Sequence, residues 1–232
     1  FVRVLFALKL PLGGSMTGSF YFKIGDYANA VKLLKTEAQD GNPESMYLIG
    51  ECYYNGRGVA EDHGTAFLWY KASAEQGYAD AQGDLAYCLL EGDGCKKDVQ
   101  EAFLWATRGM FNNSAVACNT LGFMYENGLV GLADLNSAFA AYSRGARLGD
   151  PSAMCNIGIY YLTGKGSIQV NKEKAAECFE NAASFGQPTA CFNLGRMYFD
   201  GDGVEQDREK GMMYFRVAAK NGHPIARQYF ET

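Results

Sequence analysis

Residues 42–77 read NPESMYLIGECYYNGRGVAEDHGTAFLWYKASAEQG, and this stretch decides the fold. It predicts two short amphipathic helices joined by a glycine-rich loop, and the pair recurs along the chain. Gly50 marks its place, and the corresponding residues follow at steps of 36, 36, 36 and 37: Ala86, Gly122, Gly158 and Gly195. A period of this length is typical of stacked-repeat proteins, in which no unit can bury its own apolar face. The sequence therefore predicts an all-α solenoid.

The composition is that of an ordered chain and argues against two classes of partner. Hydrophobic residues make up 48% of the 232 residues, and only five are proline, which favours a packed core over disorder. The net charge is −5 and no basic stripe is visible, so we expect no nucleic-acid partner. No apolar run reaches the roughly 18 residues that a membrane-spanning helix needs.

The cysteines bear on the compartment. There are seven, an odd number, so at least one thiol is free or paired between chains. Equivalent helices of stacked repeats should lie about 9–10 Å apart, too far for disulfides among Cys118, Cys155 and Cys191. Only Cys88 and Cys95 are near enough in sequence to be tested as a bridge. A reducing compartment is favoured, so we expect the cytoplasm, whereas a removed signal peptide would place the chain in the periplasm or outside the cell.

Four segments follow from the repeat pattern. Residues 1–15 lie outside it: the apolar FVRVLFALKLPL carries Arg3 and Lys9, and Gly13-Gly14-Ser15 comes next. Two interpretations are open. The segment is either a native helix followed by a turn, or a partner peptide or tag fused through an engineered linker. Residues 16–41 predict a shorter capping pair, residues 42–222 five longer pairs, and residues 223–232 a C-terminal capping helix.

Each longer pair has a predicted buried stripe and a predicted helix start. The offsets −5, −1 and +3 from the marker fall on one face of the first helix and carry small or apolar residues. The loop glycines should end the first helix in the left-handed conformation. The second helix should begin after an N-cap with an acceptor oxygen: Asp62, Asp98, Asp134, Asn171 and Asp207.

The loop and helix patterns together resemble those of a known family. Residues 190–204, ACFNLGRMYFDGDGV, and residues 66–72, AFLWYKA, are similar to Sel1-like repeats, which are related to tetratricopeptide repeats. The resemblance covers about residues 42–222, with Ala86, Cys95, Val130 and Asn171 as departures, and the pair at 16–41 resembles a tetratricopeptide unit. It implies a right-handed α-superhelix whose first helices line a concave face, and a scaffold or adaptor role.

The residues that could carry catalysis or bind a metal do not form a recognisable constellation. The GxG loops recur in every unit without a preceding strand or a P-loop lysine, so structural glycine is the favoured reading over phosphate binding. His63 and His223 are the only histidines, and nothing in the sequence places either beside a nucleophile. No CxxC pair is present for zinc. We therefore expect a chain that is not an enzyme and has no metal or cofactor.

The first-helix positions left over from the buried stripe are the candidate binding residues. By analogy with tetratricopeptide repeats, offsets −3, +1 and +4 face the concave groove; the alternative is that some pack between repeats and the rest form a solvated face. The candidates are Tyr47, Glu51, Tyr54, Gly83, Tyr87, Leu90, Asn119, Phe123, Glu126, Ile159, Leu162, Phe192, Arg196 and Phe199.

This set is apolar and aromatic for a surface, and its charges are mainly acidic, which predicts a matching partner. Such surfaces mark binding sites, so we expect a protein or peptide segment that is apolar with one or two basic residues. Residues 1–12 have this composition and are hypothesised to mimic or be the partner. The alternative function is an immunity or inhibitor protein that neutralises a toxin or enzyme by surface binding.

Overall fold

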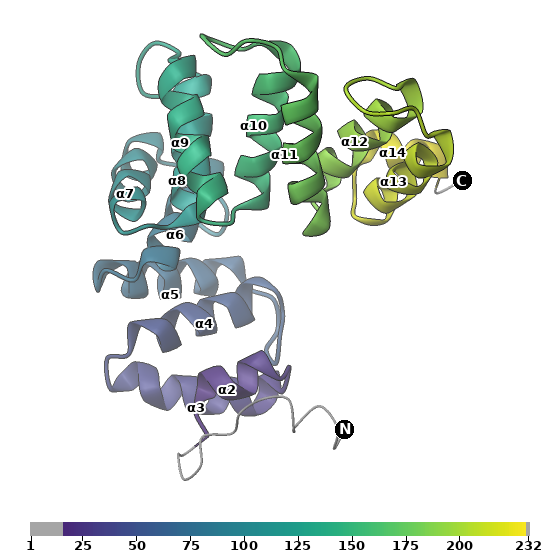
Figure 1. Ribbon diagram of the computed structural model, residues 1–232. Helices are drawn as coiled ribbons and strands as arrows, with labels where there is room; N and C mark the ends of the chain where they lie inside the picture. The colour runs from purple at the N-terminus through teal and green to yellow at the C-terminus, as the bar shows by residue number, and fades with distance from the viewer. Residues whose placement is uncertain (1–15, 231–232) are drawn as a thin grey trace.

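The computed structural model describes residues 16–230, and within them every regular element is a helix. Five helix pairs follow one another, each joined by a loop with glycines (Figure 1). The first helices of the pairs are α4 (Pro43–Tyr54), α6 (Ala79–Glu91), α8 (Ala115–Glu126), α10 (Pro151–Thr163) and α12 (Pro188–Asp200). The second helices are α5 (His63–Glu75), α7 (Val99–Phe111), α9 (Leu135–Arg147), α11 (Lys172–Ser184) and α13 (Arg208–Lys220). The predicted all-α solenoid is confirmed.

Shorter helices lie at both ends of the stack. The pair α2 (Gly18–Lys23) and α3 (Tyr27–Gln39) packs against α4, and α14 (Pro224–Phe230) packs against α13. The hypothesis that residues 1–12 dock in the groove concerns a segment outside the described residues.

The core runs along the stack as a series of clusters between neighbouring helices. The −1 position of each first helix is at most 7% exposed, and the −5 position at most 2%. The +3 position is less uniform, because Tyr53, Tyr125 and Tyr161 remain partly exposed. Second-helix rings lie against the marker glycines, so that a Cβ on Gly50 would lie 2.6 Å from the Tyr70 ring. Small residues at the marker therefore let the two helices of a pair cross closely.

The predicted helix starts and loop glycines are confirmed. All five predicted N-caps accept a backbone N–H bond from the first turn of the second helix, as Asp207 does from Lys210 at 2.9 Å. The second loop glycine has a further role, illustrated by Gly94 with φ 69°: a Cβ there would overlap the backbone of His63, the first residue of α5. Gly58, Gly166 and Gly203 contact the preceding pair in the same way. The GxG loops are inter-repeat contacts.

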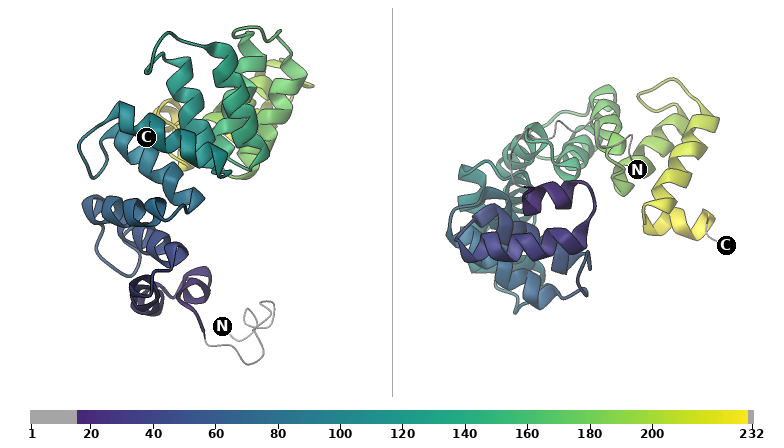
Figure 2. Two further views of the ribbon diagram at one scale, coloured as in Figure 1. Left: turned by 90° about the vertical axis from the view of Figure 1, so that its left-hand side faces the viewer. Right: turned by 90° about the horizontal axis from the view of Figure 1, so that it is seen from below.

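The stack forms an open arc, and its course changes direction near α6 and α7. Helices α2–α5 lie across the view in Figure 1, whereas α8–α11 run upright, and Figure 2 shows the two ends of the arc apart. All seven cysteines are free, and the Cys95 thiol donates to the Cys88 carbonyl instead of bridging to its sulfur. Among the described residues, no helix is long and apolar enough to cross a membrane.

Candidate concave binding pocket

The bend of the stack depends on two glycines that bring α8 against α6. Helix α6 contacts α8 extensively, whereas the other successive first helices barely touch. A Cβ on Gly83 of α6 would lie 2.9 Å from the backbone nitrogen of Ala117, and one on Gly109 of α7 would lie 2.6 Å from the Ala117 Cβ. A side chain at Gly83 would meet the α8 backbone and one at Gly109 would meet the Ala117 side chain, so the two glycines let α8 approach α6 and α7 closely.

Inside the bend lies a pocket of about 340 Å³ that draws residues from α4, α5, α6, α8 and α10. Three carboxylates line it: Glu51, Asp84 and Asp150. Three tyrosines form much of its wall, and neutral polar side chains complete it. These further residues include Tyr54, Tyr70, Tyr87, Asn119, Thr120 and Ser152. Because the first helices of four successive pairs contribute, the pocket belongs to the inner face of the bend.

The three carboxylates have hydroxyl partners or helix-cap roles but no cation. Tyr70 donates to Glu51 at 2.6 Å, Tyr47 hydrogen-bonds Asp84, and Asp150 caps α10 by accepting from the Ala153 backbone at 2.5 Å. Within residues 16–230 none of the three forms a salt bridge. The pocket therefore concentrates negative charge that this part of the chain does not neutralise.

Burial and mutual repulsion change how these acids titrate. Burial, and then the neighbouring charge of Glu51, raise the pKa of Asp84 to about 7. Burial also raises the pKa of Asp150, although backbone hydrogen bonds at the start of α10 oppose the shift. A cation entering the pocket would favour the ionised form of Asp84, because an opposite charge nearby lowers a carboxyl pKa.

A histidine holds the outer wall of the pocket in place. The Tyr54 hydroxyl donates to Asp93 at 2.9 Å, and His63 Nδ1 lies 2.5 Å from the other Asp93 oxygen. The Tyr54 and His63 rings stack at 4.6 Å, and His63 Nε2 lies 3.2 Å from Glu61. The hydrogen bond that His63 donates to Asp93 raises the pKa of His63, so two carboxylates face a readily protonated ring.

The same contacts determine the state of Asp93. Burial alone would raise its pKa, but hydrogen bonds from His63 and Tyr54 outweigh burial and lower it. The other histidine, His223, caps α14 and stacks on Phe192 at 4.2 Å. Neither ring has a hydrogen-bonded nucleophile among the described residues. The histidines of this part of the chain are structural supports.

The structure brings together four of the fourteen candidate residues in the pocket: Glu51, Tyr54, Tyr87 and Asn119. Tyr47 lies behind it, with its ring 5.8 Å from that of Tyr70. Gly83 shapes the bend but does not face the pocket, and Leu90 is only 3% exposed within the core.

The remaining candidates lie further along the stack. Phe123 is 43% exposed, Ile159 packs against the core, and Glu126 pairs with Lys165 and accepts from Tyr142. Two other hollows contain the last four candidates: Leu162 with Arg196, and Phe192 with Phe199. Offsets −3, +1 and +4 therefore include surface positions, core positions and one backbone contact.

Seven of the residues that line the pocket were not among the candidates, and three of them determine its chemistry: Asp84, Tyr70 and Asp150. Asp84 is at offset −2, one position away from the offsets assumed to face the groove, yet it is the only charged residue between Ala81 and Leu90. An isolated charge in such an apolar run was the available signal. Tyr70 lies on a second helix, whereas only first-helix positions were candidates, and Asp150 lies before α10 as its N-cap.

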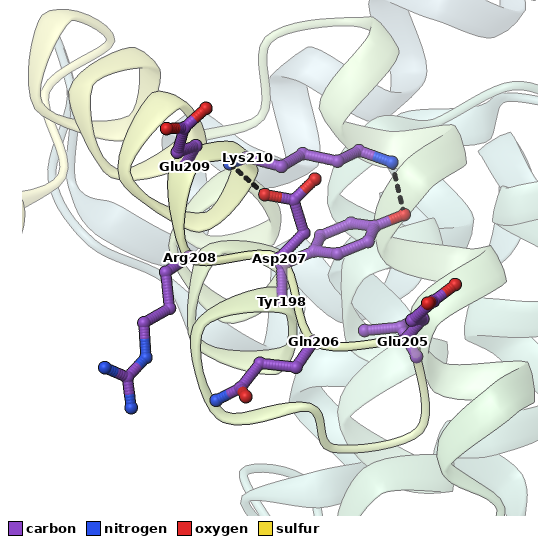
Figure 3. Close-up of a pocket in the computed structure, with 8 residues that line it drawn as sticks. Tyr198, Glu205, Gln206, Asp207, Arg208, Glu209 and Lys210 are labelled. Atoms are coloured by element: carbon purple, nitrogen blue, oxygen red, sulfur yellow. Dashed lines mark hydrogen bonds between the residues drawn. The ribbon is translucent and has the colours of Figure 1, made fainter.

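Another hollow, of about 810 Å³, lies elsewhere and is explained by helix capping. It lies beside the loop between α12 and α13 and is lined by Tyr198 and residues 204–210 (Figure 3). Asp207 accepts from the Lys210 backbone, and the Lys210 ammonium donates to the Tyr198 hydroxyl at 2.6 Å. Arg208 and Glu209 point away from this pair in Figure 3. Asp207, Lys210 and Tyr198 thus satisfy one another, so this hollow is a weaker candidate site.

Comparison with known proteins supports the repeat assignment. The family model described as Sel1 repeat matches residues 43–78, 79–109, 115–150, 151–184 and 188–223. No curated protein matches the chain.

Three similar solved structures share the fold. A Sel1 repeat protein from Oxalobacter formigenes is 29% identical, with a TM-score of 0.72 over 90% of this chain and 83% of that one. A putative Sel1 repeat protein from Klebsiella pneumoniae is 20% identical, with a TM-score of 0.59 over 85% and 96% of the two chains. The immunity protein Pa5087 from Pseudomonas aeruginosa is 22% identical, with a TM-score of 0.57 over 79% and 67%.

Proposed function

This chain belongs to the Sel1 repeat family, a family of protein-interaction scaffolds, and we propose that it is a non-catalytic adaptor that holds a partner segment on its concave face. The segment is apolar and carries one or two basic residues, one of which enters the pocket of Glu51, Asp84 and Asp150. The proposal rests on these three carboxylates, because none of them forms a salt bridge with a cationic side chain of residues 16–230. The free cysteines support a reducing compartment, in keeping with a cytoplasmic adaptor.

The pocket suits a lysine or arginine side chain for three reasons. Its carboxylates supply charge, its tyrosine wall offers ring faces for cation–π contact, and its partial burial strengthens both interactions. The volume of about 340 Å³ leaves room for one long side chain with its apolar stem. An anion or a purely apolar ligand would leave the carboxylates unpaired, which is costly.

The test uses a synthetic peptide with the sequence of residues 1–12, FVRVLFALKLPL, because it has the proposed chemistry. The protein is the full chain with Arg3→Glu and Lys9→Glu, so that its own segment does not compete. Fluorescence anisotropy should show binding of the labelled peptide and none of a peptide with both basic residues changed to glutamate. Glu51→Gln with Asp84→Asn should weaken binding at least about tenfold, because truncating one partner of a desolvated charge pair costs about 2–5 kcal/mol.

A matched control removes the same two charges elsewhere. Glu44→Gln with Glu91→Gln alters exposed acids on α4 and α6 and should change affinity less than about threefold. Equal losses from the two double variants would assign binding to general charge and not to the pocket. Equal binding of the basic and acidic peptides would also contradict the proposal.

A second candidate function is neutralisation of a toxin or enzyme by covering a basic surface. Two observations favour it: the acidic pocket, and the immunity titles of the Pseudomonas aeruginosa proteins Pa5087 and PA5088, which share the fold at 22% and 20% identity. A folded basic partner would bind over a wider area than one peptide. Binding of such a partner that the twelve-residue peptide fails to displace would favour neutralisation over segment capture.

A further inference from the structure

Three hollows occupy the same place in the repeat, where the end of one first helix meets the next first helix. In the acidic pocket this place is marked by Tyr54, Asp84 and Tyr87. Their counterparts three repeats later, Leu162, Asn193 and Arg196, line a hollow of about 270 Å³. Phe199 and Tyr229 stand at the places of Tyr54 and Asp84 in a groove of about 430 Å³. Because equivalent positions of a solenoid face the same side, the three hollows follow one surface.

The chemistry of this place changes along the stack from acidic to apolar. Residues 42–126 contain 12 acidic and 5 basic side chains, a net charge of −7, whereas residues 127–230 contain 10 and 11, a net charge of +1. The last hollow, here called the apolar groove, is lined by Phe192, Phe199, Met212, Phe215, Ala226 and Tyr229. The Arg208 guanidinium lies over the Phe199 ring at 5.4 Å, so the edge of the groove is cationic.

Rings that are buried in the inner repeats are accessible in the apolar groove. Tyr70, Tyr142 and Phe179, the counterparts of Phe215, are at most 2% exposed, whereas Phe215 is partly exposed and Tyr229 is 74% exposed. Exposed aromatic surface of this kind is typical of binding sites. An apolar side chain would gain most from covering it, and a basic one would meet the Arg208 charge.

We propose that the apolar groove is a second anchor, which holds a bulky apolar side chain of the same partner segment whose basic residue occupies the acidic pocket. This inference rests on the proposed function. The two anchors are four repeats apart, and directly packed helices lie roughly 10 Å apart, so the path between the anchors along the concave face is at least roughly 40 Å. An extended chain spans that distance in about 12 residues. The concave face thus selects the spacing between a basic and an apolar residue, not only their presence.

The experiment uses synthetic peptides with two anchors and the full chain carrying Arg3→Glu and Lys9→Glu. One end carries Val-Arg-Val and the other Leu-Phe, joined by proline-rich spacers of about 4, 8, 12 or 16 residues at about 3.1 Å each. Matched peptides lack the Leu-Phe end. The best two-anchor peptide should bind at least about tenfold more tightly than its one-anchor match, because the second contact becomes intramolecular.

Two substitutions assign the gain to the apolar groove. Tyr229→Glu places a charge in the groove at a residue that is 74% exposed, so it should remove the gain while leaving one-anchor binding unchanged. Met213→Glu changes a residue of α13 that is 49% exposed and does not line the groove, and it should leave both affinities unchanged.

The outcomes separate this inference from the proposed function. A one-anchor peptide that fails to bind contradicts the proposed function itself. One-anchor binding with no gain at any spacer length overturns only the second anchor. A chain that is a dimer in solution, and a monomer with Tyr229→Glu, would assign the apolar groove to self-association. That result would also overturn the second anchor.

Discussion

At the scale of single residues, Asp84 is the group whose behaviour the pocket determines most strongly. Its carboxyl lies among other acids inside the bend, and its pKa of about 7 puts its charge change near neutral pH. His63 titrates in the same part of the molecule, but it serves the wall through Asp93 and Tyr54. The pocket therefore gains negative charge as pH rises through 7, which would favour a basic ligand.

Asp84 should also make stability depend on pH. The unfolded chain releases this proton near pH 4, whereas the native chain keeps it to about pH 7. The group thus stabilises the native state at low pH, and this contribution is lost as pH rises from about 4 to about 7. Between pH 5 and pH 8, the free energy of unfolding of Asp84→Asn should therefore rise by about 1–3 kcal/mol relative to that of wild type. Urea unfolding at several pH values measures this difference.

The wild-type and variant chains both keep His63, so their difference isolates Asp84. Glu91→Gln, at an exposed acid of the same helix, should track wild type across this pH range. A difference between Asp84→Asn and wild type that stays constant with pH would contradict a raised native pKa.

At the scale of elements, the helices and their starts follow from the sequence, and the bend does not. The 36-residue period and the acceptor residues before each second helix predict the pairs and their caps, because both are local patterns. The bend needs Gly83, Gly109 and Ala117 to meet across three helices. Offsets transferred from related repeats gave Glu51 and Tyr54 but missed Asp84, because offset −2, which also lines the later hollows, was not among them.

Gly83→Ala should destabilise the chain by about 1–3 kcal/mol, because the new Cβ would meet the backbone at Ala117 and a helix would have to shift. Gly64→Ala is the matched control: its Cβ would make an ordinary contact at 3.4 Å, and at the second residue of α5 the change should alter the free energy of unfolding by less than about 0.5 kcal/mol. Urea unfolding of both variants measures the difference. A Gly83→Ala variant with an unchanged free energy of unfolding would show that there is space for a side chain between α6 and α8.

At the scale of the whole molecule, the repeat supplies an architecture and its departures supply the candidate function. Equivalent positions line one face, so a polarity that changes along the stack can recognise different side chains of one extended segment. The acidic half and the apolar groove arise from a few residues per repeat while caps and core stay constant. Periodicity predicts where such residues lie, but their chemistry becomes a site only when the bend brings several repeats together.

The most direct test of the central claim counts the protons released when the peptide FVRVLFALKLPL binds at pH 7. Titration calorimetry in two buffers with different ionisation enthalpies, on the chain with Arg3→Glu and Lys9→Glu, gives this number. A group with a pKa of about 7 is half protonated at pH 7, so a basic side chain beside Asp84 should release about half a proton per peptide. Asp84→Asn should abolish the release. Peptide binding with the same proton count in both chains would contradict a basic residue in this pocket.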